Sequence, residues 1–150
     1  MFCDLVDSTV LSGQLDPEDL REVLRAYQAT CAEVIQRFEG HIAQYLGDGV
    51  LVYFGYPQAH EDDAQRAVRT GLGIVEAMGT LNSRLGQEKG VCLAVRVGIH
   101  TGLVVVGEMG GGSGYRGTPE AFRAIHSHCE AAEMISQSPP QQLSIVEALV

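Results

Sequence analysis

The stretch Gly40–Gly55 limits what this chain can fold into more than any other. Two apolar runs, each long enough for one β-strand, lie on either side of the triplet Gly47-Asp48-Gly49. Because glycine adopts positive φ without steric cost, an acidic residue between two glycines predicts a tight reversal. The stretch therefore predicts a β-hairpin with the carboxylate of Asp48 at its tip. An ordinary Asp-Gly turn explains the same residues, since a turn does not need that carboxylate to form.

A second acidic residue interrupts an apolar run at the start of the chain. Phe2–Val6 has the length of a strand and contains Asp4. Burying an acidic side chain costs free energy unless a cation or a metal ion accompanies it. The following residues, Asp7-Ser8-Thr9, offer side chains that cap a helix. Because the strand pattern starts at once, we expect the natural N-terminus to lie upstream of Met1.

Two long segments have the three-to-four spacing of apolar residues that is typical of amphipathic helices. The first opens at Asp16-Pro17, a capping residue followed by the proline favoured at the first helical position, and ends at Gly40. The second is entered through Pro57–Asp63 and continues over Ala64–Leu85. Its predicted apolar face consists of Ala67, Val68, Leu72, Val75, Met78 and Leu81.

The remaining patterns complete the predicted order of elements. Val91–His100 and Leu103–Glu108 are rich in β-branched residues and predict a second hairpin. The patterns beyond it predict, in order, a flexible loop, a helix, a short strand and a terminal helix: Gly110–Gly114, Thr118–Cys129, Met134–Ser136 and Gln141–Val150. Helices returning over a mainly antiparallel sheet indicate an α+β sandwich of ferredoxin-like type, with residues 1–150 as one domain.

Composition narrows the choice of partners and compartment. The net charge of −9 argues against a nucleic acid or an anionic membrane as the main partner. No apolar run has the length of a membrane span. No two cysteines form a CxxC pair, which favours buried free thiols in a reducing cytoplasm. These cysteines are Cys3, Cys31, Cys92 and Cys129.

The predicted sheet allows Asp4 and Asp48 to lie side by side. Two carboxylates about 4 Å apart repel by roughly 4 kcal/mol at an effective dielectric of about 20, and divalent cations between them remove that repulsion. Aspartate oxygens with open positions suit Mg²⁺ or Mn²⁺ bound jointly with substrate phosphates. The amides of the Leu5–Thr9 turn would cradle those phosphates. Arg96, a charge inside a strand pattern, would supply the missing positive charge.

Two other clusters contain residue types that bind metals, and each has a plainer explanation. His60-Glu61-Asp62-Asp63 precedes a helix, where acidic residues interact favourably with the helix dipole. His126, His128 and Cys129 have no fourth zinc ligand in view, which favours a structural or exposed role.

Three segments together resemble the signature of the class III nucleotide cyclases, in that family's order and spacing. They are Phe2–Thr9, Leu46–Gly49 and Val95–Gly102. The resemblance implies an adenylate cyclase-like enzyme that converts ATP to 3′,5′-cyclic AMP and pyrophosphate in intracellular signalling. It also implies a homodimer, or pairing with another cyclase domain, because the family's sites lie at a dimer interface.

The resemblance also implies roles for individual residues. Asp4, Asp48 and the backbone carbonyl of Leu5 would hold two Mg²⁺ or Mn²⁺ ions, one beside the ribose 3′-hydroxyl and one on the leaving phosphates. Arg96 would contact the phosphates, and Arg123 would act as the catalytic arginine. The other positions implied to bind the nucleotide are Val6, Ser8, Thr9, Gln44 and Gly47.

The chain departs from the family pattern in four places. Asp7 stands where glycine is usual, and Gln44 stands where many members have a purine-selecting lysine. Glu120 and Ala124 replace an asparagine and an arginine, and Arg123 lies about 100° around a helix from the arginine position. The chain also ends before the family's distal hairpin. A catalytically silent nucleotide-binding or dimerisation module of the same fold therefore stays an alternative; a diguanylate cyclase-like domain ranks last, because its acidic turn motif is absent.

Overall fold

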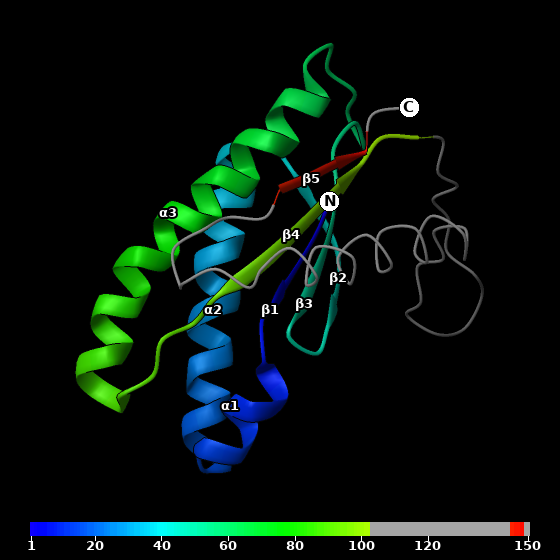
Figure 1. Cartoon of the computed structure of the whole chain (residues 1–150). Helices are drawn as coiled ribbons and strands as arrows, with labels where there is room; N and C mark the ends of the chain where they lie inside the picture. Colours follow the sequence, from blue (N-terminus) through cyan, green and yellow to red (C-terminus); the bar gives the residue numbers. More distant parts are fainter. Residues whose placement is uncertain (103–144, 149–150) are drawn as a thin grey trace.

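The computed structural model describes residues 1–102 and 145–148, which form a sheet, two long helices and a short helix (Figure 1). The elements follow one another as β1 (Phe2–Leu5), α1 (Ser8–Gln14), α2 (Pro17–Arg37), β2 (His41–Leu46), β3 (Gly49–Tyr53), α3 (Asp63–Lys89), β4 (Val95–His100) and β5 (Ile145–Ala148). Among these residues, no helix is long and apolar enough to cross a membrane.

The strands are ordered β2-β3-β1-β4-β5, which places β1 in the middle of the sheet. β1 runs antiparallel to both neighbours, with Cys3 opposite Val50 of β3 and Asp4 opposite Arg96 of β4. The first four strands, with α2 and α3 as the connections across the sheet, have the antiparallel ferredoxin-like arrangement. The predicted α+β fold class is confirmed.

α2 and α3 pack against each other over one face of the sheet, as Figure 1 shows. Alternate residues of a strand point to opposite faces, so Cys3 and Leu5 enter the core under the helices while Phe2 and Asp4 point away from it. We call the face away from α2 and α3 the distal face. It carries a second, smaller apolar cluster formed by Phe2, Ala43 and Leu51.

The start and the buried side of α2 are as the sequence predicts. The Asp16 side chain accepts hydrogen bonds from the backbone N–H groups of Glu18 at 3.0 Å and Asp19 at 2.9 Å, and Pro17 is the first helical residue. The buried residues of α2 recur at the predicted spacing and are Val23, Tyr27, Cys31, Val34 and Ile35.

α3 forms where predicted, and its buried side agrees with the predicted one in part, because Ala67, Met78 and Leu81 are buried. Leu72 is 47% exposed, whereas Gly71 and Ile74 are buried. A methyl group added at Gly71 would lie 3.3 Å from Val97 Cγ1, so the missing side chain lets the helix approach the sheet closely. The prediction did not count glycine, and so it missed the close approach at Gly71.

The strand predicted over Val91–His100 is wrong in its first part. β4 begins at Val95, and the preceding backbone is held by a side chain instead of a neighbouring strand. Asn82 of α3 donates to the carbonyl of Leu93 at 2.8 Å and accepts from its N–H group at 2.7 Å. Both polar groups of Leu93 are thereby satisfied outside the sheet.

The terminal helix predicted over Gln141–Val150 is wrong at Ile145–Ala148, which forms β5 parallel to β4 with Val97 opposite Ile145. A short apolar run has no spacing that separates a strand from a buried helix, and pairing with β4 decides in favour of the strand. The strand, loop, helix and second strand predicted within residues 103–144 lie outside the described residues.

Candidate functional site

Asp4 and Arg96 form an ion pair across the middle of the sheet. Arg96 Nε donates to Asp4 Oδ1 at 3.1 Å and its terminal nitrogen donates to Asp4 Oδ2 at 3.2 Å. The two side chains are 17% and 21% exposed, Asp4 being the more buried. One guanidinium therefore engages both oxygens of a largely buried carboxylate, the geometry in which charge-assisted hydrogen bonds are strongest. The sequence singled out both residues and missed that they pair.

Gln44 shares the distal face with this ion pair. Its antiparallel partner is Leu51, which belongs to the distal apolar cluster, and directly opposite residues lie on the same face of a sheet. A bulge between Ile42 and Gln44 sets this register. Three of the predicted site residues thus lie on one face, while α2 and α3 cover the other.

The predicted hairpin with Asp48 at its tip is confirmed, and its two glycines act differently. Gly47 has φ of +67°, which glycine adopts at least cost. Gly49 makes room for β1, because a methyl group there would lie 2.6 Å from the ring of Phe2. A further contact has no signal in the sequence: Gln28 of α2 donates to the carbonyl of Gly47 at 3.1 Å.

The strand register brings the end of β1 toward this tip. Cys3 pairs with Val50, and the next residues along the two strands are Asp4 on β1 and Gly49, the residue after Asp48, on β3. Both acidic residues therefore belong to the same end of the β1–β3 pair. The convergence of their carboxylates on shared cations stays a prediction.

The donor chemistry of this region fits a hard divalent cation. Asp4 already binds a cationic group through both of its carboxylate oxygens. Within residues 1–102 and 145–148, no group of three or more His, Cys, Asp or Glu residues could hold a metal ion. Mg²⁺ does not need such a cage, since it is commonly bound through one or two carboxylates together with substrate phosphates.

The Leu5–Thr9 turn leads from β1 into α1. The Val6 N–H group donates to the carbonyl of Ala94 at 2.9 Å and so continues the β1–β4 ladder, and the contact of this turn with phosphate stays a prediction. Ser8 and Thr9 begin α1. The predicted capping by Asp7 is also wrong, because its side chain makes no capping hydrogen bond. Its φ of +55° is a conformation that favours glycine.

A buried thiol–phenol cluster lies directly beneath Asp4. Cys3 Sγ lies 3.4 Å from the hydroxyl of Tyr27, and Cys3, Tyr27 and Cys31 are all fully buried. Contact with the Cys31 thiol and burial raise the pKa of Cys3, and burial raises the pKa of Tyr27. Cys3 and Tyr27 are therefore neutral packing elements behind the site, whereas the hydrogen bond with Cys3 lowers the pKa of Cys31. Cys31 confirms the expected burial, whereas Cys92 is exposed, against the expectation.

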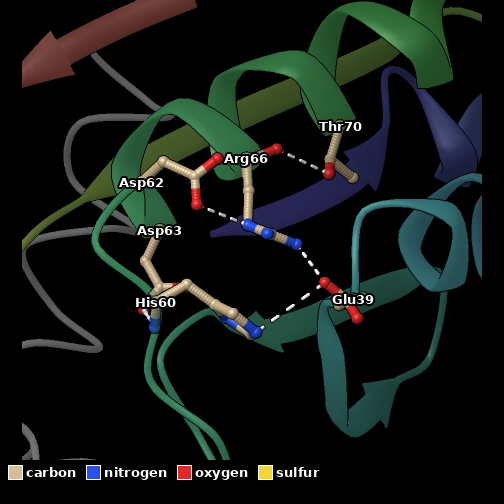
Figure 2. A network of polar contacts seen from close by, with 6 residues as sticks. All are labelled: Glu39, His60, Asp62, Asp63, Arg66 and Thr70. Atoms are coloured by element: carbon tan, nitrogen blue, oxygen red, sulfur yellow. Dashed lines mark hydrogen bonds and ion pairs between the residues drawn. The ribbon is translucent and has the colours of Figure 1, made fainter.

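The acidic cluster before α3 forms a structural network (Figure 2). Arg66 binds Asp62 at 2.7 Å and also binds Glu39, while His60 Nδ1 lies 3.2 Å from Asp63 Oδ1. The hydrogen bond from Arg66 lowers the pKa of Asp62. Because Glu39 follows α2, the network fastens the end of α2 to the start of α3. This outcome agrees with the plainer explanation of the cluster.

The remaining predicted residues of the site lie outside the described part of the chain. These are the predicted catalytic arginine and the two substitutions beside it, together with the second metal-type cluster: Arg123, Glu120, Ala124, His126, His128 and Cys129.

Comparison with known proteins gives a consistent family. The profile of the family described as "Adenylate and Guanylate cyclase catalytic domain" matches residues 1–113. Adenylate cyclase 1 of Rhizobium meliloti is 34% identical over 110 residues, which are 73% of this chain and 16% of that protein. An uncharacterised protein of the same organism is 33% identical over 144 residues, 96% of this chain and 13% of that protein. The chain thus spans a small part of these relatives.

Solved structures with the same fold point the same way. The guanylyl cyclase Cya2 matches with a TM-score of 0.80 and 32% identity over 87% of this chain and 67% of the other. The adenylyl cyclase CyaB from P. aeruginosa matches with a TM-score of 0.82 and 26% identity over 96% of this chain and 73% of the other.

Proposed function

Because this chain belongs to the family of adenylate and guanylate cyclase catalytic domains, we propose that it forms a cyclic nucleotide from a nucleoside triphosphate. The substrate we assign is ATP and the products are 3′,5′-cyclic AMP and pyrophosphate. The observation that carries this proposal is the largely buried Asp4 on the distal face, at the end of the sheet where the Asp48 hairpin tip lies. The activity would serve signalling in the cytoplasm.

In this proposal the acidic residues hold the metal ions. Asp4, Asp48 and the carbonyl of Leu5 bind two Mg²⁺ or Mn²⁺ ions. Such ions, when bound, supply a Lewis acid for the 3′-hydroxyl and a countercharge for the leaving pyrophosphate. The support is the donor set itself: carboxylate and carbonyl oxygens suit Mg²⁺ and Mn²⁺ and not softer metals.

The remaining residues bind and orient the nucleotide. Arg96 presents a planar fork of N–H donors that matches phosphate geometry. Gln44 lies on the same face and offers both a donor and an acceptor for the edge of the base. Ser8, Thr9 and Gly47 lie at the turns that flank the acidic residues, and Arg123 is proposed as the catalytic arginine on resemblance alone. We further propose that two copies, or this domain and another cyclase domain, complete each site.

The test is direct synthesis. Purified chain is incubated with Mn²⁺ and either ATP or GTP, and cyclic nucleotide and pyrophosphate are measured. We expect cyclic AMP as the product. We expect Asp48→Asn to lower the rate by at least about a hundredfold, which is the scale of losing one electrostatic contact to the transition state. Glu76→Gln, an equal charge change on an exposed position of α3, is the matched control and keeps the rate.

Ala124 favours a second candidate function, a silent nucleotide-binding or dimerisation module, because alanine cannot supply the arginine contact expected at its position. Nucleotide binding that depends on Mn²⁺, with no product from either ATP or GTP, would establish this function in place of catalysis. Sedimentation equilibrium with and without nucleotide tests the pairing of two copies.

A further inference from the structure

The ion pair between Asp4 and Arg96 has a consequence for cation binding. We propose that Arg96 is the resident counter-ion of Asp4, which a divalent cation displaces on binding, so that the guanidinium becomes available to an anionic ligand. This inference rests on the proposed function, because it takes Asp4 as a metal ligand. It assigns Arg96 a positioning role before substrate arrives.

Geometry fixes the pair before any ligand is present. Asp4 and Arg96 are directly opposite on β1 and β4, and the pairs on either side of them are Cys3–Val97 and Leu5–Val95. Both neighbouring pairs belong to the apolar core or pack against it, so the ladder is anchored on both sides of the ion pair. The guanidinium therefore stands beside the carboxylate as a consequence of the strand register.

Arg96 and a divalent cation compete for the same two carboxylate oxygens of Asp4. The carboxylate gives one oxygen to Nε and the other to a terminal nitrogen, so the fork lies across the edge at which a cation would bind. A divalent ion on the same oxygens would lie within a few ångströms of the guanidinium carbon, and like charges repel most strongly at a largely buried site. Binding of the cation therefore weakens the hold of Asp4 on Arg96.

The displaced guanidinium remains next to the cation because its backbone is fixed in β4. Its donors then match the phosphate oxygens of a ligand that the cation also binds. The exchange thus couples the two events: the cation releases the arginine, and the arginine then binds the anion. Without a cation, Asp4 keeps its countercharge.

Binding of Mn²⁺ alone, followed by electron paramagnetic resonance on the full chain without nucleotide, tests the competition. We expect Arg96→Gln to bind Mn²⁺ about tenfold more tightly than the unchanged chain, because the competing cation is gone. Arg96→Lys retains the charge and binds within about twofold of the unchanged chain. Arg21→Gln, the same charge change at an exposed position of α2, controls for overall charge and leaves the affinity unchanged.

A second readout does not depend on any variant being stable. The Nε–H resonance of Arg96 is followed by NMR in the unchanged chain while Mg²⁺ is added. This resonance is assigned by its absence from the spectrum of Arg96→Lys. We expect a saturable shift at the Mg²⁺ concentration that fills the site. Mn²⁺ binding that Asp4→Asn weakens, combined with an unmoved resonance or with equal affinity in Arg96→Gln, would overturn the inference. Equal Mn²⁺ binding by Asp4→Asn and the unchanged chain would instead overturn the metal site of the proposed function.

Discussion

Asp4 and Arg96 show how much a single residue's role depends on a partner far away in sequence. Asp4 and Arg96 each lie within the apolar pattern of a strand, so each is a charged residue that needs a partner of opposite charge. That they compensate each other follows only from the register of β1 on β4, which joins residues 92 positions apart. Local patterns carry no information about such a register, and the sequence therefore predicted the residues without predicting the contact.

Gln28 is a second residue whose role is visible only in the structure. Its side chain donates to the carbonyl of Gly47, the residue before Asp48. We expect Gln28→Ala to lower Mn²⁺ affinity by about two- to fivefold, the scale of one exposed hydrogen bond that steadies a ligand-bearing turn. Gln36→Ala, an exposed glutamine on the same helix, is the control for the titration. Equal affinities in the two variants would show that the turn needs no support from α2.

Asp62 leads to a prediction of how the stability of the fold depends on pH. Its hydrogen bond from Arg66 lowers its pKa below the ordinary value of 3.8, so the stability that it contributes is present above that value and is lost as the pH falls further. Chemical unfolding should show Asp62→Asn to be less stable than the unchanged chain at about pH 7, with the difference shrinking as the pH falls below 3.8. Glu61→Gln, its exposed neighbour, is expected to differ little at either pH.

At the scale of elements, α2 shows what the spacing of apolar residues predicts, and α3 shows what that spacing misses. The start of α2 follows from Asp16 and Pro17, which act locally, and both the start and the buried face were predicted. The buried face of α3 was predicted only in part, because two of its close approaches to neighbouring elements are made at glycines. Gly71 faces Val97 of the sheet and Gly73 faces Val34 of α2. A search for the spacing of large apolar residues does not detect either glycine.

Two glycines of α3 make this difference measurable. A methyl group at Gly73 would lie 2.9 Å from Val34 Cγ1, a stiff and buried β-branched side chain, whereas one at Gly79 would meet nothing within 4 Å. We expect Gly79→Ala to stabilise the fold by about 0.5–1 kcal/mol through helix propensity. Gly73→Ala should destabilise it by about 1–3 kcal/mol through overpacking. Urea unfolding compares them, and a stabilised Gly73→Ala would show that α2 and α3 can move apart freely.

At the scale of the whole molecule, the net charge of −9 opposes a polyanionic ligand. Charge of one sign slows the approach of a ligand of the same sign, and salt screens this repulsion. We expect the association rate of Mg–ATP to rise between about 20 and 200 mM salt, over which range the Debye length shortens about threefold. Stopped-flow binding measures this rate, and adenosine, which carries no phosphate, is the control. A rate that falls with salt would mean that a local basic surface outweighs the net charge.

The central position of β1 also orders events during synthesis of the chain. β1 is made first, yet one of its two neighbours in the sheet is β4, whose Arg96 lies 92 residues beyond Asp4. Closing a loop of that length is slow compared with forming helices and hairpins, which depend on contacts between nearby residues. The β2–β3 hairpin and both long helices can therefore form on the ribosome before β4 is made, whereas the pairing of β1 with β4 cannot. The proposed catalytic centre would therefore assemble after the helices and the hairpin that surround it.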